Sequence, residues 1–258
     1  MSEALKKQIF PEPIPQKKSK VCVVMPAYNA ASTLVRTYRA IPPGSVDEML
    51  LVDDASYDDT VEIAKLLGIR TIVHEKNKGY GGNQKTCYTD ALRQGMDIIV
   101  MLHPDYQYDP AIVPELVRPI AEGKAKVVFA SRMLGDPLKG GMPLYKFIFN
   151  KSLTAIQNFV FGTHYSEFHT GYRAFHRKAL EAINFQANSD DFIFDNEIIA
   201  QLMMKGFKIH EIPVITRYAK DSSSVSFKRS VVYGLNILMV TLKYFLHKRG
   251  WLHFSLFE

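Results

Sequence analysis

The sequence has little cysteine and little tryptophan: its 258 residues include two cysteines and one tryptophan. Cys22 and Cys87 cannot build a disulfide framework, so a small disulfide-stapled fold is excluded. Cys22 lies in an apolar run, where a buried thiol is expected, and this cysteine usage favours a reducing cytoplasm. The N-terminal residues lack an apolar segment followed by a small-residue cleavage site, so no secretory signal is predicted.

The sequence also lacks a basic run interleaved with aromatic residues, and it matches no nucleic-acid-binding module. Nucleic acid is therefore not expected as a partner, and no internal repeat or low-complexity tract is visible. The formal net charge is nevertheless +6, with a pI of about 9.1. This excess of positive charge favours an acidic partner, such as a nucleotide-sugar, a phosphate or an anionic membrane surface.

The hydrophobic share of 47% is enough for one sizeable core, which we expect over residues 21–228. Residues 1–20 carry prolines and then lysines, which predicts an extended, poorly packed arm. Residues 229–258 predict an appended amphipathic helix.

Apolar runs alternate with helical patterns at short spacing through the first half of the chain. Strands are predicted at 21–25, 48–52, 69–74, 97–102 and 127–130. Helices are predicted at 30–41, 60–67 and 112–120, and a further helix follows a glycine-rich loop at 76–82 and ends at about residue 93. This order predicts an α/β fold with a doubly wound, mostly parallel sheet. Ligands of such sheets bind at the carboxyl ends of the strands, where the polar residues of this sequence collect.

The second half is less regular. We expect a long helix or a broken pair of helices at 143–161, a strand or loop at 169–175 and a helix at 196–205. A strand at 207–217, a polar loop at 220–226 and a last helix at 231–248 complete the prediction.

Six short motifs occur in an order that resembles family 2 glycosyltransferases of GT-A fold. They read VMPAYN at 24–29, LVDDAS at 51–56, NKGYGG at 77–82, ASR at 130–132, HTGYR at 169–173 and FDNE at 194–197. The last three narrow the resemblance to the polyprenyl-phosphate branch, typified by dolichol-phosphate mannose synthase. The resemblance covers roughly residues 20 to 228 and implies a Rossmann-like GT-A fold and a nucleotide-diphosphate sugar donor, UDP- or GDP-linked.

The resemblance implies a base pocket at the first two strand ends. Asp54 would accept a hydrogen bond from the base, while Pro26 and Ala27 line the pocket. Tyr28, followed by Asn29, would add a flat apolar contact. Asp53 and Asp54 could instead form a turn or a helix N-cap.

The family's metal motif, Asp-x-Asp, is changed in this sequence. His103 replaces the first acid, Asp105 keeps the second, and Gln107 adds a polar side chain two residues on. Mg²⁺ prefers oxygen ligands, whereas imidazole is better suited to softer metals. The expected cofactor is therefore a divalent metal, Mn²⁺ or Mg²⁺, and manganese is favoured because it accepts both kinds of ligand. The alternative is that His103 only hydrogen-bonds a neighbour.

Basic residues are the candidates for binding phosphate. The backbone N–H groups near Gly79 could approach a diphosphate, and the Lys78 side chain could add positive charge. Guanidinium groups pair bidentately with phosphoryl oxygens, which favours Arg132 and Arg173 as clamps. The resemblance adds Lys146 facing the acceptor phosphate, and a loop with Arg217 and Ser223 that closes over the diphosphate. Each of these could instead be an exposed, solubilising residue.

The acceptor decides the mechanism. A hydroxyl acceptor would need a carboxylate base, for which Asp195 and Glu197 are the candidates. A phosphate monoester, with its second pKa near 6, is already nucleophilic and needs none. We favour the phosphate, with inversion at the anomeric carbon and with Asp195 orienting arginines or the acceptor. Asp195 could also be a helix-start carboxylate.

The last predicted helix is apolar, with basic residues at both ends and Trp251 beyond it. It is too short and interrupted to span a bilayer, but it suits the membrane interface, which predicts a peripheral protein on the cytoplasmic membrane face. A core helix or the interface of a homo-oligomer is the alternative. Two other functions stay open: transfer to a glycan or small-molecule hydroxyl, and an inactive sugar-nucleotide-binding homologue.

Overall fold

A computed structural model describes residues 19–216 and 227–258 and contains a seven-stranded sheet in the order β3-β2-β1-β4-β6-β5-β7. Only β6 runs antiparallel to its neighbours, so the predicted mostly parallel α/β sheet is confirmed. The strands are β1 (Val21–Ala27), β2 (Glu48–Asp53), β3 (Arg70–Val73), β4 (Ile98–Met101), β5 (Val127–Ser131), β6 (Arg173–His176) and β7 (Ile209–Pro213).

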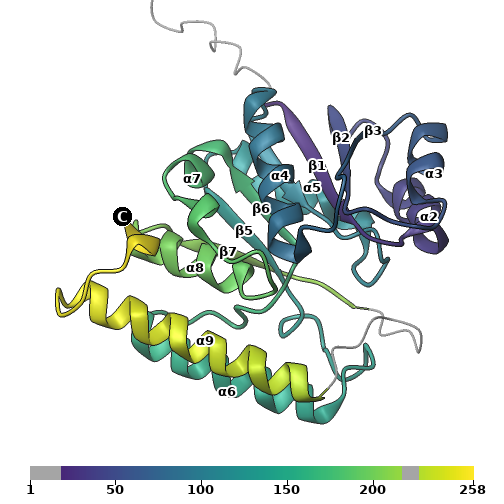
Figure 1. Cartoon of the computed structure of the whole chain (residues 1–258). Helices are drawn as coiled ribbons and strands as arrows, with labels where there is room; N and C mark the ends of the chain where they lie inside the picture. The colour runs from purple at the N-terminus through teal and green to yellow at the C-terminus, as the bar shows by residue number, and fades with distance from the viewer. Residues whose placement is uncertain (1–18, 217–226) are drawn as a thin grey trace, which may run out of the picture.

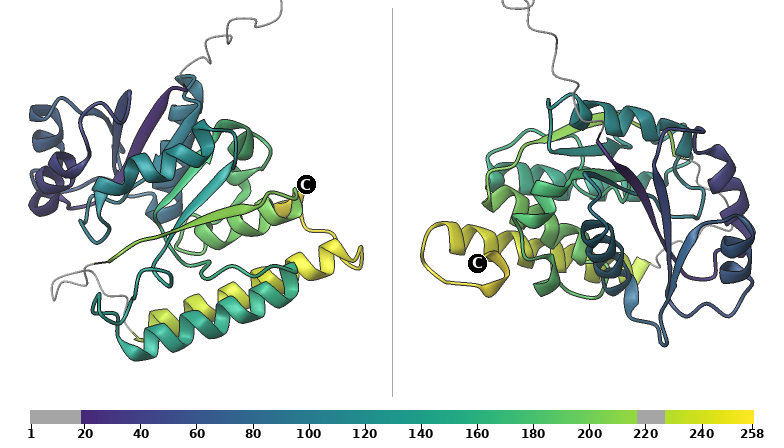
Figure 2. Two further views of the ribbon diagram at one scale, coloured as in Figure 1. Left: turned by 180° about the vertical axis from the view of Figure 1, so that it is seen from behind. Right: turned by 90° about the horizontal axis from the view of Figure 1, so that it is seen from above.

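Helices cover both faces of the sheet (Figures 1 and 2). The described α-helices are α2 (Ala31–Ala40), α3 (Thr60–Leu66), α4 (Gly79–Arg93), α5 (Val113–Ala121), α6 (Leu144–Phe161), α7 (Arg177–Glu181), α8 (Phe194–Met204) and α9 (Phe227–Lys248). Short 3-10 turns occupy η1 (Pro110–Ile112), η2 (Phe185–Ala187) and η3 (Ser255–Phe257).

The sheet separates two hydrophobic clusters, and β1 contributes to both. Cys22 and Val24 face the cluster shared with α4, α8 and α9, whereas Val23 and Met25 face the cluster shared with α2, α3 and α5. Burial on both faces explains why this strand reads as a continuous apolar run rather than an alternating one.

The last helix belongs to the same core as the sheet. Ile237, Val240 and Tyr244 of α9 are buried in the cluster that also contains residues of α4 and α8. α9 lies beside α6 (Figures 1 and 2), and a Cβ at Gly234 would lie 2.4 Å from Phe149 Cζ, so glycine permits this close approach. The expected boundary at residue 229 therefore does not separate an appended element from the domain.

The glycine-rich segment differs from the predicted loop, because α4 begins inside it at Gly79. Gly81 donates a backbone hydrogen bond of 2.7 Å to the Asp190 carbonyl, and a Cβ at Gly81 would lie 2.3 Å from the Ser189 carbonyl oxygen. The absence of side chains at these glycines thus allows α4 to pack closely against residues 189–190. α7 was not predicted, because five residues are too few for a periodic pattern.

No helix within residues 19–216 and 227–258 combines the length and apolarity needed to cross a bilayer.

Candidate functional site

A cavity of about 1200 Å³ opens where β1 and β4 end, and it extends to α6 and α9. Its walls combine polar side chains that follow the strands with apolar side chains of the two helices. Among the residues predicted from sequence, those that line it are Pro26, Tyr28, Asn29, His103, Asp105, Gln107, Arg132, Lys146 and Asp195.

The end of β1 is held by the loop that follows β2. The backbone N–H of Asn29, a residue with a positive φ of 52°, donates to Ser56 Oγ at 2.8 Å. Tyr57 N–H donates in return to Asn29 Oδ1 at 3.1 Å. Tyr28 stays 51% exposed, with its ring 6.0 Å from that of Tyr57. Ala27 is buried within β1 beside this exposed aromatic surface.

Asp54 lies outside this cavity, at the N-terminal end of α4. Its carboxylate accepts backbone hydrogen bonds from Lys78 (2.8 Å) and Gly79 (3.0 Å), and it lies 2.7 Å from His74 Nδ1. Asp54 is only 3% exposed, so these partners leave it little room for a base. The alternative interpretation as a cap fits, although the helix is α4 and not the next helix along the chain.

Asp53, Lys78 and Gly79 also lie away from the cavity. Asp53 is fully buried and accepts from Ser56 N–H at 2.9 Å, while its second oxygen has no partner among the described residues. Lys78 lines a separate groove on the α4 side of the molecule. The expected approach of Lys78 and Gly79 to a diphosphate does not fit this geometry, and for Asp53 the turn alternative fits.

The altered metal motif follows β4 and faces the cavity. Desolvation raises the pKa of Asp105 above its ordinary value, and the charge of His103 partly offsets that rise. Asp105 also accepts from Gln107 N–H at 2.9 Å. No group of three or more His, Cys, Asp or Glu side chains in the described part of the chain is placed to hold a metal. The oxygen donors of Asp105 and Gln107 fit a hard cation.

His103 has a partner that the sequence did not indicate. Its Nε2 lies 3.1 Å from Tyr80 Oη, and the two rings stack with centroids 5.3 Å apart. Tyr80 Oη donates in turn to Asp195 Oδ2 at 2.8 Å. The imidazole nitrogen left for a metal is therefore Nδ1, and the hydrogen-bonding alternative for His103 fits the structure.

Arg173 lies beneath Asp195 rather than in the cavity. It is 1% exposed, and its Nη1 lies 3.2 Å from Asp195 Oδ1. Its Nε donates to the Thr170 carbonyl at 2.7 Å, and its guanidinium lies 4.7 Å from the Phe129 ring centroid. Because these contacts use its donors, Arg173 is placed to orient Asp195 and does not fit the predicted phosphate clamp.

Glu197 does not reach the cavity. It accepts from Ser189 N–H at 2.6 Å, and desolvation raises its pKa. Of the two carboxylates considered as bases, only Asp195 lines the cavity.

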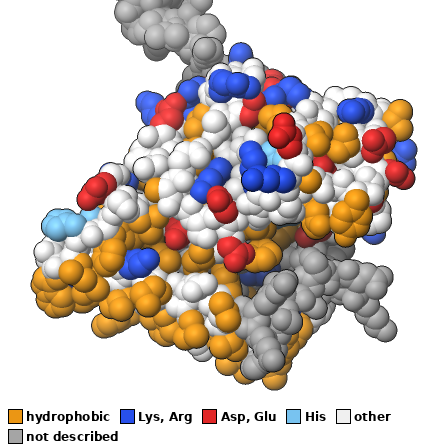
Figure 3. Space-filling model, viewed as in Figure 1, with side chains coloured by type: hydrophobic (Ala, Val, Ile, Leu, Met, Phe, Trp, Pro, Cys, Tyr) orange, Lys and Arg blue, Asp and Glu red, His pale blue; other side chains and the backbone are white. Residues whose placement is uncertain are grey.

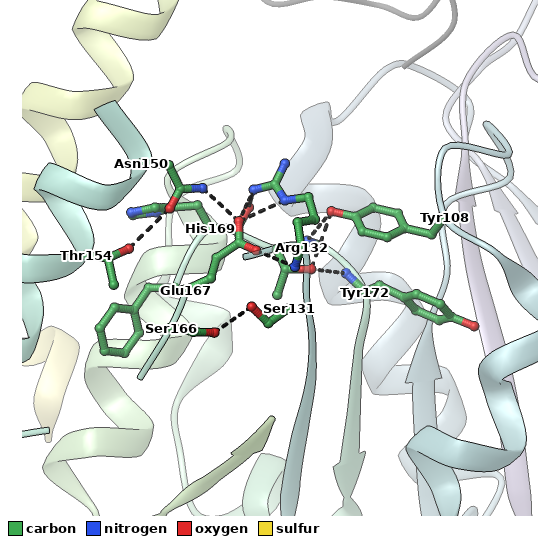
Figure 4. Close-up of polar contacts among 12 residues, drawn as sticks. Tyr108, Ser131, Arg132, Asn150, Thr154, Ser166, Glu167, His169 and Tyr172 are labelled. Carbon is green, nitrogen blue, oxygen red and sulfur yellow. Dashed lines mark hydrogen bonds and ion pairs between the residues drawn. The ribbon is translucent and has the colours of Figure 1, made fainter. Parts of the chain in front are cut away.

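Arg132 reaches the cavity from the end of β5 and is held by Glu167 (Figure 4). Arg132 Nε donates to Glu167 Oε1 at 2.8 Å, its backbone N–H donates to Oε2 at 2.8 Å, and Nη2 also contacts this carboxylate. Burial alone would raise the pKa of Glu167, but the Arg132 charge and donors outweigh it, so the net pKa is lowered. Sequence reasoning missed Glu167, although an acid two residues before the HTGYR motif was visible.

Lys146 of α6 faces the same cavity as Arg132. Desolvation and the Arg132 charge both lower its pKa. His169 also lines the cavity, and its Nε2 is buried with no partner among the described residues. Burial lowers the pKa of His169 to about 4, so this imidazole is neutral at pH 7.

The α6 and α9 side of the molecule is apolar at its surface (Figure 3). The exposed apolar side chains of these two helices include Leu144, Tyr145, Ile148, Phe149, Ile156, Phe159, Val231, Val232, Leu235, Leu238, Met239 and Leu242. Tyr145, Phe149, Val231 and Val232 also line the cavity. One cavity therefore joins the apolar surface of α6 and α9 to the polar strand ends. Arg217 and Ser223 lie outside the described residues.

Comparison with known proteins places the chain among sugar transferases. The sequence profile described as glycosyl transferase family 2 matches residues 22–183. An uncharacterized protein from Methanocaldococcus jannaschii is 31% identical over 221 residues, which cover 86% of this chain and 90% of the relative. A UDP-N-acetylglucosamine–dolichyl-phosphate N-acetylglucosaminyltransferase from Methanococcus voltae is 26% identical over 219 residues, which cover 78% of this chain and 87% of the relative.

A solved structure matches the fold. Glucosyl-3-phosphoglycerate synthase from Mycobacterium tuberculosis, in complex with Mg²⁺ and UDP, has a TM-score of 0.68 and 18% sequence identity. The match covers 88% of this chain and 79% of that one. The same enzyme has also been crystallised with Mn²⁺. The expected GT-A-like α/β fold is confirmed.

Proposed function

The chain belongs to glycosyl transferase family 2, and we propose that it transfers a sugar from a UDP- or GDP-linked donor to a polyprenyl phosphate, with inversion at the anomeric carbon. One observation carries this proposal: a single cavity joins the strand-end residues to the apolar faces of α6 and α9. A donor with a charged diphosphate suits the first half, and a lipid suits the second.

The donor half would be organised by Tyr28, Asn29 and Pro26 around the base, with Asp105 and Gln107 beyond. A divalent ion held by these two residues, with His103 beside it, would neutralise the diphosphate leaving group. Arg132 adds a fixed positive charge on the same cavity wall. We also propose that Arg217 and Ser223 contact the diphosphate, as the family resemblance implies.

The acceptor half needs no general base. A phosphate monoester is largely a dianion above its second pKa near 6, so positioning and charge neutralisation supply the catalysis. Lys146 and Arg132, which both line the cavity, would hold this phosphate. Asp195, fixed by Tyr80 and Arg173, would then orient the reacting groups.

The exposed apolar surface of α6 and α9 supports a proposal of membrane docking. We propose that α6 and α9 lie on the cytoplasmic face of a membrane and admit the lipid phosphate between them. Leu235 and Met239 of α9 are 61% and 53% exposed, and an exposed apolar surface of this kind marks a site where a membrane or another protein binds. The surface could also bind a second copy of this chain, and the experiment below separates the two.

A hydroxyl acceptor is the second candidate, because Asp195 lines the cavity and could serve as its base. A panel of UDP- and GDP-sugars offered with polyprenyl phosphate, a short soluble analogue and a glycerate acceptor separates these reactions. Transfer to glycerate alone would favour the hydroxyl acceptor. Nucleotide binding without any turnover would indicate an inactive homologue.

The docking surface is tested by the double variant Leu235→Glu/Met239→Glu, neither residue of which lines the cavity. Burying each side chain is worth roughly 1.5–3 kcal/mol, so sedimentation with anionic vesicles should fall at least about tenfold. Transfer to polyprenyl phosphate should fall with it, while transfer to the short analogue should not. Leu66→Glu on α3, where the leucine is 86% exposed, is the matched control. If the wild type is instead a dimer that this variant dissociates, with unchanged vesicle binding, the surface is a homo-oligomer interface.

A further inference from the structure

Glu167 is a fully buried carboxylate beside the cavity, and the function proposed above does not use it. It is 0% exposed, and it lies between Asn150 of α6 and Arg132 at the end of β5 (Figure 4). Asn150 Nδ2 donates at 2.7 Å to Glu167 Oε1, the same oxygen that accepts from the guanidinium. A buried carboxylate is costly unless it is paired, so this arrangement needs a reason.

The contacts between Glu167 and Arg132 restrict both the backbone and the side chain of the arginine. Oε2 accepts the Arg132 backbone N–H at 2.8 Å, while Oε1 accepts Nε at 2.8 Å. Arg132 Nη2 also donates to the His169 carbonyl at 2.7 Å. A long, flexible side chain is thereby held in one orientation at the cavity wall.

The segment that carries Glu167 is itself anchored. Glu211 of β7 accepts from the backbone N–H of Ser166 at 2.9 Å and from that of Glu167 at 3.3 Å. Ser166 Oγ lies 2.6 Å from Ser131 Oγ at the end of β5. Glu167 therefore has a fixed backbone from which to hold Arg132.

We propose that Glu167 is a positioning residue that holds the Arg132 guanidinium toward the phosphate groups of the substrates. Asn150 links this pair to α6, the helix that also carries Lys146. The inference rests on the proposed role of Arg132 at a phosphate. It is independent of whether the acceptor is a lipid, because the donor supplies a diphosphate in either case.

The test is a double-mutant cycle with Glu167→Gln, Arg132→Met and the combined variant. The readouts are calorimetric binding of UDP or GDP, whichever the wild type binds, and kcat with the corresponding donor. Glu167→Gln should weaken nucleotide binding about tenfold and lower kcat by up to about 100-fold, because small misplacements of a positioning group cost this much. The combined variant should bind nucleotide and turn over no worse than Arg132→Met alone, because Glu167 acts through the arginine.

The thermal stabilities of the three variants should not follow the same order as their activities. Arg132→Met leaves the Glu167 carboxylate buried without its partner, so its thermal transition should fall. The combined variant should recover part of that transition, because the unpaired buried charge is gone, without recovering activity, because the arginine is still missing. A merely structural Glu167 would give the same stability pattern, so the non-additive losses of kcat and nucleotide affinity are the readout that identifies a positioning role. If Glu167→Gln does not fold, Glu167→Asp keeps the charge but is too short to reach both donors, and it should show an intermediate loss.

Glu181→Gln in the Arg177–Glu181 pair of α7 is the control, since this ion pair lies outside the cavity. Wild-type nucleotide affinity and kcat in a folded Glu167→Gln protein would overturn the proposal. So would losses from the two substitutions that simply add. A protein that binds nucleotide but ignores polyprenyl phosphate would contradict the proposed acceptor and leave the binding cycle interpretable.

Discussion

The strand-end half of the cavity and the half formed by α6 and α9 are held in different ways. At the strand ends, hydrogen bonds connect neighbouring loops, as where Asn29 N–H donates to Ser56 Oγ at 2.8 Å. On the helices, the side chains facing outward are apolar, and Ile148 and Leu235 are 55% and 61% exposed. Fixed polar groups suit a charged ligand of defined shape, whereas an apolar surface suits a partner that is only loosely specified.

The difference indicates where each kind of substitution should act. Changes at the strand ends should alter chemistry and local stability, while changes on the helix surface should alter access to the acceptor. Glu167 contacts both Asn150 of α6 and Arg132 at the end of β5, so changes there test whether the halves are independent.

Asp105→Ala should have the largest effect, because it removes the carboxylate that follows β4 and lines the strand-end half of the cavity. Transfer should fall about 100- to 1000-fold, as when a group that stabilises developing charge is lost, with the thermal transition unchanged. Mn²⁺ should support at least as much activity as Mg²⁺, and His103→Asp should move the preference toward Mg²⁺. Activity that persists in excess chelator would show that basic residues neutralise the diphosphate alone.

Asp54→Ala should reduce stability rather than chemistry. The substitution removes a carboxylate that accepts from Lys78 and Gly79 N–H and pairs with His74, so the free energy of unfolding should fall by about 2–3 kcal/mol. Chemical denaturation measures this loss, and calorimetry with UDP and GDP measures binding in the still-folded protein. Unchanged nucleotide affinity would remove Asp54 from the base pocket, whereas a loss of affinity without a loss of stability would restore it there.

His169 should give the smallest effect, a loss of stability in mild acid. Burial lowers its pKa to about 4, below the unfolded value of 6.5, so the unfolded chain binds the proton more readily between these values. Stability should therefore fall as the pH drops through this window, by about 1 kcal/mol between pH 7 and pH 5.5. Denaturation of His169→Gln at both pH values should show a shallower dependence. An identical dependence would mean that this imidazole is accessible to protons in the native protein.

The sheet was predictable because its pattern is local. The apolar runs at 21–25 and 97–102 correspond to β1 and β4, and the polar residues after them line the cavity. β6 was harder to predict, because its antiparallel direction depends on neighbours that are distant in sequence. The glycine-rich segment was expected as a loop, since its packing against Asp190 leaves no sign in the local pattern.

The sequence by itself determined the family resemblance, the α/β order and the placing of Tyr28, His103 and Asp105 at strand ends. Only the tertiary structure decided which charged groups pair, because a buried charge takes its partner from whatever the fold brings near. Arg173 is paired with Asp195 below the cavity, and Arg132 with Glu167 beside it. Each arginine ends one of the short motifs, Arg132 in ASR and Arg173 in HTGYR, yet of the two only Arg132 lines the cavity, because Arg173 is buried.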